Sequence, residues 1–286
     1  MTRLLLVMVW LLHWLPLPLL AALGRGLGLL LYALVRERRR ITLINLGLCF
    51  PQLSDAEKSA LARRHFAVLG RSLLELGLWW WASPARIKRL VRLEGEEHLA
   101  AHQGKPVILL APHFVALDAG GARLNIDYAM VSIYARAKNR VFDGALRRGR
   151  ERFGKLQLVA RTDGVAKVLR PLRAGTPFYY LPDMDYGRHD AVFVPFFGYP
   201  AATITGLSRL AKISGAVVLP VITRMVDDHY VTSIGEAWTD FPTDDVTADT
   251  RRMNAYLETE IMKSPEQYYW LHKRFKTRPR GEQKVY

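Results

Sequence analysis

The most continuous apolar pattern lies at the N-terminus. From Leu4 to Val35 the only charged side chain is Arg25, and the stretch Leu4–Leu23 is long enough to cross a bilayer. Several helix-weakening residues interrupt it and argue against one straight span, namely His13, Pro16, Pro18, Gly24, Gly26 and Gly28.

Three interpretations of this segment are open: a cleaved signal peptide, a buried helix of a soluble protein, and a retained membrane anchor. A signal peptide would have only Arg3 as its basic region and an overlong apolar part. A helix that is apolar on all sides is unusual inside a domain of this size. We therefore predict that residues 1–35 form an anchor segment, which either spans the membrane or lies in its interface.

Helical patterns follow the anchor. Ser54 and Glu57 have the spacing of a capping box, which predicts a helix start that continues to about Leu69. A second helical stretch, Arg71–Trp81, ends in three consecutive tryptophans. Three neighbouring side chains cannot all face one helix core, so a buried corner and an interfacial aromatic belt both remain open.

From Val107 onward, short apolar runs alternate with helical stretches, as in α/β proteins. The predicted strands are Val107–Leu110, Ala129–Tyr134, Gln157–Val159, Phe178–Leu181, Val217–Val221 and Tyr230–Ile234. The predicted helices are Leu117–Leu124, Val141–Phe153, Gly164–Ala174, Gly206–Ser214 and Ala248–Lys263. This pattern predicts an α/β fold with a central, mostly parallel or mixed sheet flanked by helices. Without a repeat or linker, residues 36–286 are expected to form one catalytic domain.

Charge narrows the choice of partners. The chain has 41 Lys and Arg against 26 Asp and Glu, a net charge of +15, which calls for nucleic acid, anionic lipid, a phosphorylated substrate or an acidic protein. Four arginines follow the apolar segment, Arg36, Arg38, Arg39 and Arg40. They predict that the rest of the chain lies on the cytoplasmic face of a membrane. The single cysteine, Cys49, excludes an internal disulfide and a cysteine-rich metal site.

The strongest candidate for catalysis is the pair His113 and Asp118, which directly follows the predicted strand Val107–Leu110. A histidine can take a proton from a hydroxyl so that the oxygen attacks a carbonyl, and a carboxylate can orient the ring. Residues five apart on one helix point away from each other. The two therefore meet only if His113 precedes the helix and Asp118 lies on its first turn.

A second acidic feature, Asp183 and Asp185, ends the predicted strand Phe178–Leu181. Two carboxylates in such a loop can bind a metal, orient an arginine or cap a turn. Because no further Asn or Glu clusters there and the calcium-loop spacing is missing, we predict no metal.

Basic residues gather after the second predicted strand, Ala129–Tyr134, and around the third, Gln157–Val159. They form a solvated helix face or a binding surface for phosphate or an acidic protein, and comprise Arg136, Lys138, Arg140, Arg147, Arg148, Arg150, Arg152, Lys155 and Arg161. Arg161 follows a strand and precedes a helix, on the side of the sheet where α/β proteins bind ligands.

Three other classes of enzyme lack their motif in this chain. There is no phosphate loop with Lys-Ser or Lys-Thr, no Gly-x-Ser-x-Gly nucleophile elbow and no His-Glu-x-x-His zinc helix. Direct transfer to a base-activated hydroxyl is the chemistry best supported by the remaining residues.

At this point the chain resembles the late acyltransferases of lipid A biosynthesis, relatives of the glycerolipid acyltransferases with their His-x-x-x-x-Asp signature. The resemblance covers nearly the whole chain. It rests on Asn45–Pro51, His113–Asp118, Pro182–Gly187, Val192–Gly198 and Pro265–Pro279. Met184 departs from the family, which often has Gln or His there, and Asp118 replaces the Glu of many relatives.

The resemblance implies transfer of a fatty acyl chain from acyl carrier protein, without any other cofactor. The acceptor would be the hydroxyl of a 3-hydroxyacyl chain on a Kdo-modified, phosphorylated lipid A precursor, at the cytoplasmic face of the inner membrane. His113 and Asp118 would be catalytic. Arg161 would contact the substrate with Asp183 as its partner, unless these two form only a structural ion pair. Asp185 and Arg136 would also contact the substrate.

Two alternatives remain. The same pair could serve a glycerophospholipid or lysophospholipid acyltransferase, against which the C-terminal signature argues. A protein of another class, without catalysis, could bind nucleic acid or anionic lipid at the membrane through its basic surface. We expect membrane lipids and acyl carrier protein as partners, and no nucleic acid.

Overall fold

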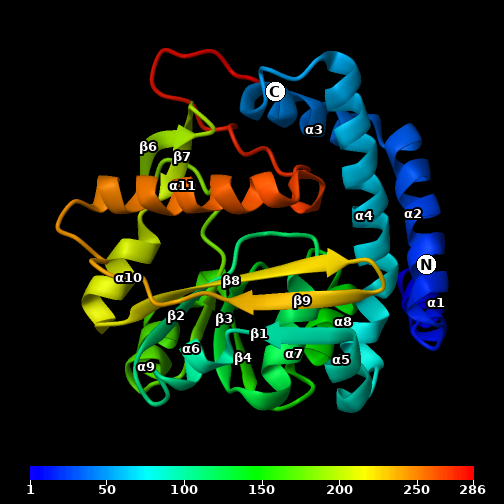
Figure 1. Cartoon of the computed structure of the whole chain (residues 1–286), viewed down its shortest axis with the longest axis horizontal. Coiled ribbons are helices and arrows are strands. Elements are labelled where there is room, and N and C mark those ends of the chain that lie inside the picture. The colour runs from blue at the N-terminus through cyan, green and yellow to red at the C-terminus, as the bar shows by residue number, and fades with distance from the viewer.

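A seven-stranded sheet forms the centre of the computed structural model, which describes all residues 1–286 (Figure 1). Its spatial order is β1 (Val91–Glu94), β9 (His229–Ile234), β8 (Val217–Val226), β2 (Val107–Leu110), β5 (Phe178–Tyr180), β3 (Met130–Tyr134) and β4 (Leu156–Ala160). Only β8 and β9 pair antiparallel, and all other neighbours are parallel. The predicted α/β class and the six predicted strands are therefore confirmed, and β1 is an addition.

Strand β2 is buried on both faces of the sheet. Ile108 and Leu110 belong to one hydrophobic cluster, whereas Val107 and Leu109 belong to another. Successive side chains of a strand point to opposite faces, so both faces of β2 must be covered. Helices provide that cover, which explains why this strand reads as an uninterrupted apolar run.

The covering helices were largely predicted. They are α5 (Pro84–Leu90), α6 (Glu96–Ala100), α7 (Leu117–Asp127), α8 (Arg140–Glu151), α9 (Ala166–Arg173), α10 (Gly206–Ser214) and α11 (Val246–Lys263). Figure 1 shows α11 lying across one side of the sheet, while α7 and α8 lie on the other side.

A small hairpin, β6 (Ala191–Phe196) and β7 (Tyr199–Ile204), packs beside α11 and was not predicted. Pro195 and Pro200 stand opposite each other in it. Proline cannot donate to a strand ladder and is rare inside strands. The hairpin forms nonetheless because the turn residues Phe197 and Gly198 both adopt positive φ, 51° and 77°, as a tight two-residue turn requires.

The long helix α4 (Asp55–Trp81) is continuous, although the sequence pattern predicted two helical stretches. Its predicted capping box is present, with the Ser54 amide donating to Glu57 Oε2 at 2.8 Å. Trp79 and Trp80 are buried at its end and Trp81 is half-buried, as the corner interpretation expects.

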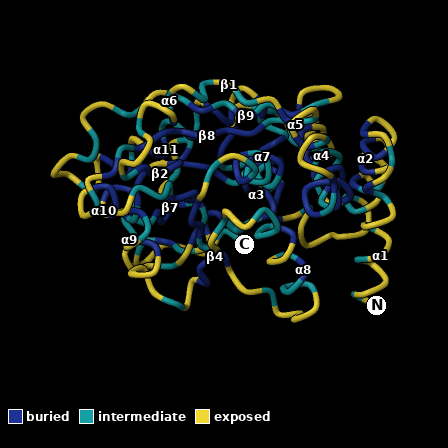
Figure 2. The backbone as a smooth tube through the Cα atoms, turned by 90° about the horizontal axis from the view of Figure 1, so that it is seen from below, coloured by how far each residue is buried: buried dark blue, intermediate teal, exposed yellow.

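Two N-terminal helices, α1 (Thr2–Leu12) and α2 (Leu17–Leu34), lie along α4, and α3 (Arg36–Cys49) follows them (Figure 1). Helix α2 is long and apolar enough to cross a membrane, with little of it buried. Its Gly24 and Gly28 touch Gly70 of α4 so closely that a Cβ at Gly70 would lie 2.1 Å from the Gly24 carbonyl oxygen. This contact explains why glycine stands inside α4. Figure 2 shows that the faces of α1 and α2 that point away from α4 are exposed. The anchor role of residues 1–35 stays a prediction.

Candidate functional site

His113 lies in the turn that leaves the carboxyl end of β2. The backbone there is anchored by the C-terminal segment, because the Tyr269 amide donates to the His113 carbonyl oxygen at 2.9 Å. The side chain is partly exposed, at 18%, and lines a cavity. His113 is thus a histidine held firmly by its backbone, with its ring accessible from the cavity.

The carboxylate bound to this ring is Asp183, in the loop after the neighbouring parallel strand β5. Nδ1 of His113 donates to Oδ1 of Asp183 at 2.7 Å, and the His113 amide donates to Oδ2 at 2.9 Å. Burial alone would raise the pKa of the Asp183 carboxyl, but the His113 imidazole and both hydrogen bonds bring that pKa below its ordinary value. The charged carboxylate fixes the ring with its proton on Nδ1, which leaves Nε2 as an acceptor.

The prediction that Asp118 orients the His113 ring is wrong, because no hydrogen bond joins these two side chains. Asp118 does lie on the first turn of α7 and in the cavity wall, but it accepts from Arg150 Nε of α8 at 2.8 Å. Arg150 was named only as part of a basic set, because nothing in the local pattern shows that α8 faces α7. Asp118 positions an arginine here instead of orienting the histidine.

The cavity has a volume of about 960 Å³, and 20 of its 32 lining residues are hydrophobic. A large apolar pocket with a few converging polar groups is the usual form of a site for an apolar ligand. The apolar wall comes from both sheet and helices and includes Ile133, Leu146, Leu156, Leu158, Leu181 and Ile213. Together with the free Nε2 of His113, this shape can hold an apolar chain beside a general base.

Arg161 also lines the cavity, but the predicted ion pair with Asp183 is not formed. The Arg161 guanidinium lies over the Tyr186 ring, 5.4 Å from its centroid, while both Asp183 oxygens are used by His113. Burial first, and then the nearby Asp183 charge, raises the pKa of Tyr186 to about 12, so this phenol stays neutral. Arg161 therefore keeps its charge free for an anionic ligand.

Asp185 and Arg136 lie outside the cavity wall. The buried Asp185 carboxylate accepts from the Thr277 amide at 2.7 Å and from the Thr277 hydroxyl at 2.8 Å. It is a link between the β5 loop and the C-terminal segment, which corrects the predicted substrate contact. Arg136, which is 63% exposed, pairs with Asp163 at 3.2 Å at the surface.

The C-terminal segment supports the site from behind. His272 Nε2 accepts the Asp185 amide at 2.9 Å, and Asn45 of α3 donates to the carbonyl oxygens of Trp270 and His272. Burial, followed by the nearby Arg274 and His113, lowers the pKa of His272 to about 4, so this ring remains neutral. Two distant sequence motifs, Asn45–Pro51 and Pro265–Pro279, thereby meet next to the loop that carries Asp183.

The acidic side chains near His113 are not arranged as metal ligands. No group of three or more His, Cys, Asp or Glu side chains has a geometry suited to an ion. The two carboxylates of the Asp-x-Asp loop face different partners, since Asp183 binds His113 and Asp185 binds Thr277. They do not converge on one point, as metal ligands would.

Comparison with known proteins places the chain in a family. Residues 1–277 match the family model of the bacterial lipid A biosynthesis acyltransferases. The chain is 34% identical to the lipid A biosynthesis palmitoleoyltransferase of Escherichia coli, over 97% of the chain and 92% of that protein. It is 35% identical to the lauroyltransferase, over 96% and 90%, and 34% identical to the myristoyltransferase, over 94% and 83%, both of E. coli.

Among solved structures, the 1-acyl-sn-glycerophosphate acyltransferase of Thermotoga maritima matches with a TM-score of 0.41 and 14% identity. The match covers 80% of this chain and 97% of that one. At this distance the likeness bears neither on the substrate nor on the roles of residues. The matches over nearly full length decide the family: the chain belongs to the bacterial lipid A biosynthesis acyltransferases.

Proposed function

We propose that this protein transfers a fatty acyl chain from acyl carrier protein to the hydroxyl of a 3-hydroxyacyl chain on a Kdo-modified lipid A precursor. The reaction takes place at the cytoplasmic face of the inner membrane. The observation that carries the proposal is the pair of His113 and Asp183, in which the histidine lines a large cavity with mostly apolar walls. A fixed base beside an apolar chain site is what transfer of an acyl group to a hydroxyl needs.

In the proposed reaction, Nε2 of His113 removes the proton from the acceptor hydroxyl. The oxygen attacks the thioester carbonyl carbon, a carbon–oxygen bond forms and the carbon–sulfur bond breaks. The imidazolium then returns its proton to the departing thiolate, so charge and atoms balance without an acyl-enzyme. Asp183 stabilises the imidazolium, because its buried, charged carboxylate accepts the hydrogen bond from Nδ1–H throughout.

The charged groups in the cavity have separate tasks in this proposal. Arg161 contacts the developing oxyanion or a substrate phosphate, because its guanidinium has no carboxylate partner. Arg150 is already bound by Asp118 and shapes the wall. The net charge of +15 favours association with an acidic carrier protein and a phosphorylated lipid.

The direct test uses membranes that contain the full chain, acyl carrier proteins loaded with C10 to C16 chains, and Kdo-modified tetra-acylated precursor. Mass spectrometry of the lipid products should show one added acyl mass. His113→Ala should reduce turnover by roughly 100-fold to 10,000-fold, the range for a lost general base. The relatives named for palmitoleoyl, lauroyl and myristoyl transfer are equally similar to this chain, so the donor series also determines chain length.

The matched control is His102→Ala, which removes a histidine that does not line the cavity. It should keep wild-type turnover. Equal product from wild type and His113→Ala would refute the mechanism, whereas product on a lysophospholipid but not on the lipid A precursor would refute the acceptor.

A further inference from the structure

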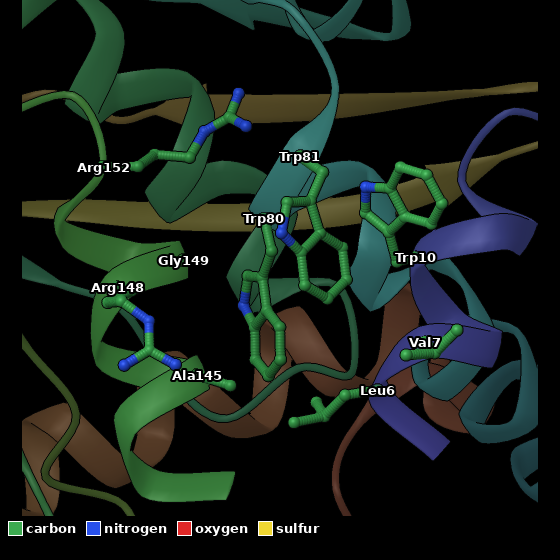
Figure 3. Close-up of a pocket in the computed structure, with 9 residues that line it drawn as sticks. All are labelled: Leu6, Val7, Trp10, Trp80, Trp81, Ala145, Arg148, Gly149 and Arg152. Carbon is green, nitrogen blue, oxygen red and sulfur yellow. The ribbon is translucent and has the colours of Figure 1, made fainter. Parts of the chain in front are cut away.

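A second cavity lies between α1, the end of α4 and α8. Its volume is about 490 Å³. Leu6, Val7 and Trp10 of α1 form one side, Trp80 and Trp81 lie in the middle, and α8 forms the other side with Ala145, Arg148, Gly149 and the adjacent Arg152. Figure 3 shows Trp80 and Trp81 between the two arginines on the α8 side and the apolar residues of α1. We call these nine residues the α1–α8 groove.

The hydrogen-bond donors of this groove lack acidic partners. Arg148 is exposed and makes neither an ion pair nor a hydrogen bond, and no acidic residue lines the groove. Arg152 donates to the carbonyl oxygen of Ala82, but its Nε is buried and unpartnered. Nε1 of Trp80 is also buried without a partner. Two like charges four residues apart on one helix repel each other unless an anion lies between them.

Helix α1, which forms one side of the groove, has many exposed apolar side chains. On α1, exposed apolar side chains include Leu4, Leu5, Val7, Met8, Trp10 and Leu11, and Trp14 follows at 68% exposure. Helix α2 adds further exposed leucines along its outer face. An amphipathic surface with tryptophans at its border matches the boundary between lipid chains and head groups.

From these observations we propose that the α1–α8 groove binds one anionic membrane phospholipid. The phosphodiester accepts hydrogen bonds from Arg148 and Arg152, and an acyl chain lies against Val7, Trp10 and Trp81. Guanidinium groups bind phosphate oxygens with two donors at a time, which selects a phosphate over a neutral acceptor. A phospholipid supplies both the anion and the apolar chain, whereas a free phosphate would leave the apolar half of the groove empty.

This lipid site is separate from the proposed reaction. The catalytic cavity and the groove share only Trp80 and Gly149 as lining residues. A Cβ on Gly149 would lie 2.3 Å from the Trp80 ring, so these two residues form a closely packed wall. The bound phospholipid fixes α1 and α8 at the membrane surface and does not enter the site of His113.

The test is native mass spectrometry of the full chain in detergent, with equimolar phosphatidylglycerol and phosphatidylcholine of identical acyl chains. Wild type should retain one phosphatidylglycerol in preference. Because each arginine near an anionic lipid contributes about a fivefold preference, Arg148→Gln together with Arg152→Gln should reduce that preference roughly 30-fold. Val7→Trp, which fills the groove without a charge change, should also abolish retention.

The matched control is Arg147→Gln. It removes the same charge from the same helix, but Arg147 pairs with Glu151 at 3.4 Å and does not line the groove. Retention should be unchanged in this variant. Equal loss in Arg147→Gln, persistent retention in Val7→Trp, or full displacement by millimolar glycerol phosphate would each overturn the proposal, the last by revealing a simple anion site. Turnover of the Arg147→Gln variant, measured in parallel, reports on the acyl transfer separately.

Discussion

The two cavities, which share Trp80 as a lining residue, differ in how their central polar groups are paired. In the catalytic cavity the central groups are paired within the protein, His113 with Asp183 and Asp118 with Arg150. In the α1–α8 groove, Arg148 has no partner and the buried Nε of Arg152 has none. Both cavities have mostly apolar walls.

This difference separates two kinds of site. A general base must be oriented before the substrate arrives, so its hydrogen bonds are made by the protein itself. A site for a charged ligand instead keeps hydrogen-bond donors free, because the ligand itself supplies their acceptors. The paired His113 is therefore assigned to chemistry, whereas the arginines without a carboxylate partner, Arg161 and Arg148, are assigned to binding anions.

The largest expected effect concerns the pairing in the catalytic cavity. Asp183→Asn removes the charge that stabilises the His113 imidazolium and allows the wrong tautomer, so turnover should fall roughly 100-fold to 1,000-fold. The matched variant Asp118→Asn should cost about tenfold or less, because Asp118 contacts Arg150 and not the histidine. Steady-state kinetics of both variants show which carboxylate supports His113. Equal losses would return Asp118 to the role that the sequence motif suggested.

A second expected effect is a loss of stability at low pH, which comes from two buried histidines that line neither cavity. Burial lowers the pKa of both His65 and His272 to about 4, whereas an unfolded chain protonates histidine below about pH 6.5. The unfolded state therefore binds more protons between these values, and the free energy of unfolding falls as the pH drops from 6.5 to 4. The fully buried His65 should contribute roughly 2 to 3 kcal/mol.

Urea unfolding at about pH 7, 5.5 and 4.5 measures this effect, and His65→Gln should flatten the slope. Phospholipid retention in the α1–α8 groove should not follow the same curve at pH values where the protein stays folded, because arginine keeps its charge. A stability that does not change between pH 7 and 4.5 would contradict the assignment of neutral buried histidines.

The smallest expected effect concerns Trp80 and Gly149, the two residues that line both cavities. Gly149→Ala forces the Trp80 ring to move, and such overpacking should lower the free energy of unfolding by about 1 to 3 kcal/mol. Both turnover and phospholipid retention should decline. The matched control Gly47→Ala has open space at its Cβ and should stabilise helix α3 slightly. A Gly149→Ala variant that affects only one cavity would show that the wall is not shared.

Local sequence predicted the parts of the site that depend on nearby residues. The apolar run Val107–Leu110 indicated a buried strand, and His113 follows it in the turn as expected. The capping box of Ser54 and Glu57 also formed. The β6–β7 hairpin was not predicted, and its tight turn depends on the positive φ angles of Phe197 and Gly198.

The sequence by itself determined the α/β class, the apolar N-terminal helices, the basic surface and the histidine at a strand end. Only the tertiary structure decided that Asp183 binds His113, because this requires β5 to lie beside β2 although 70 residues separate the two side chains. It also brought α1 beside α8, which created the α1–α8 groove. Strand order and helix packing are contacts between distant segments, and no local pattern of residues specifies them.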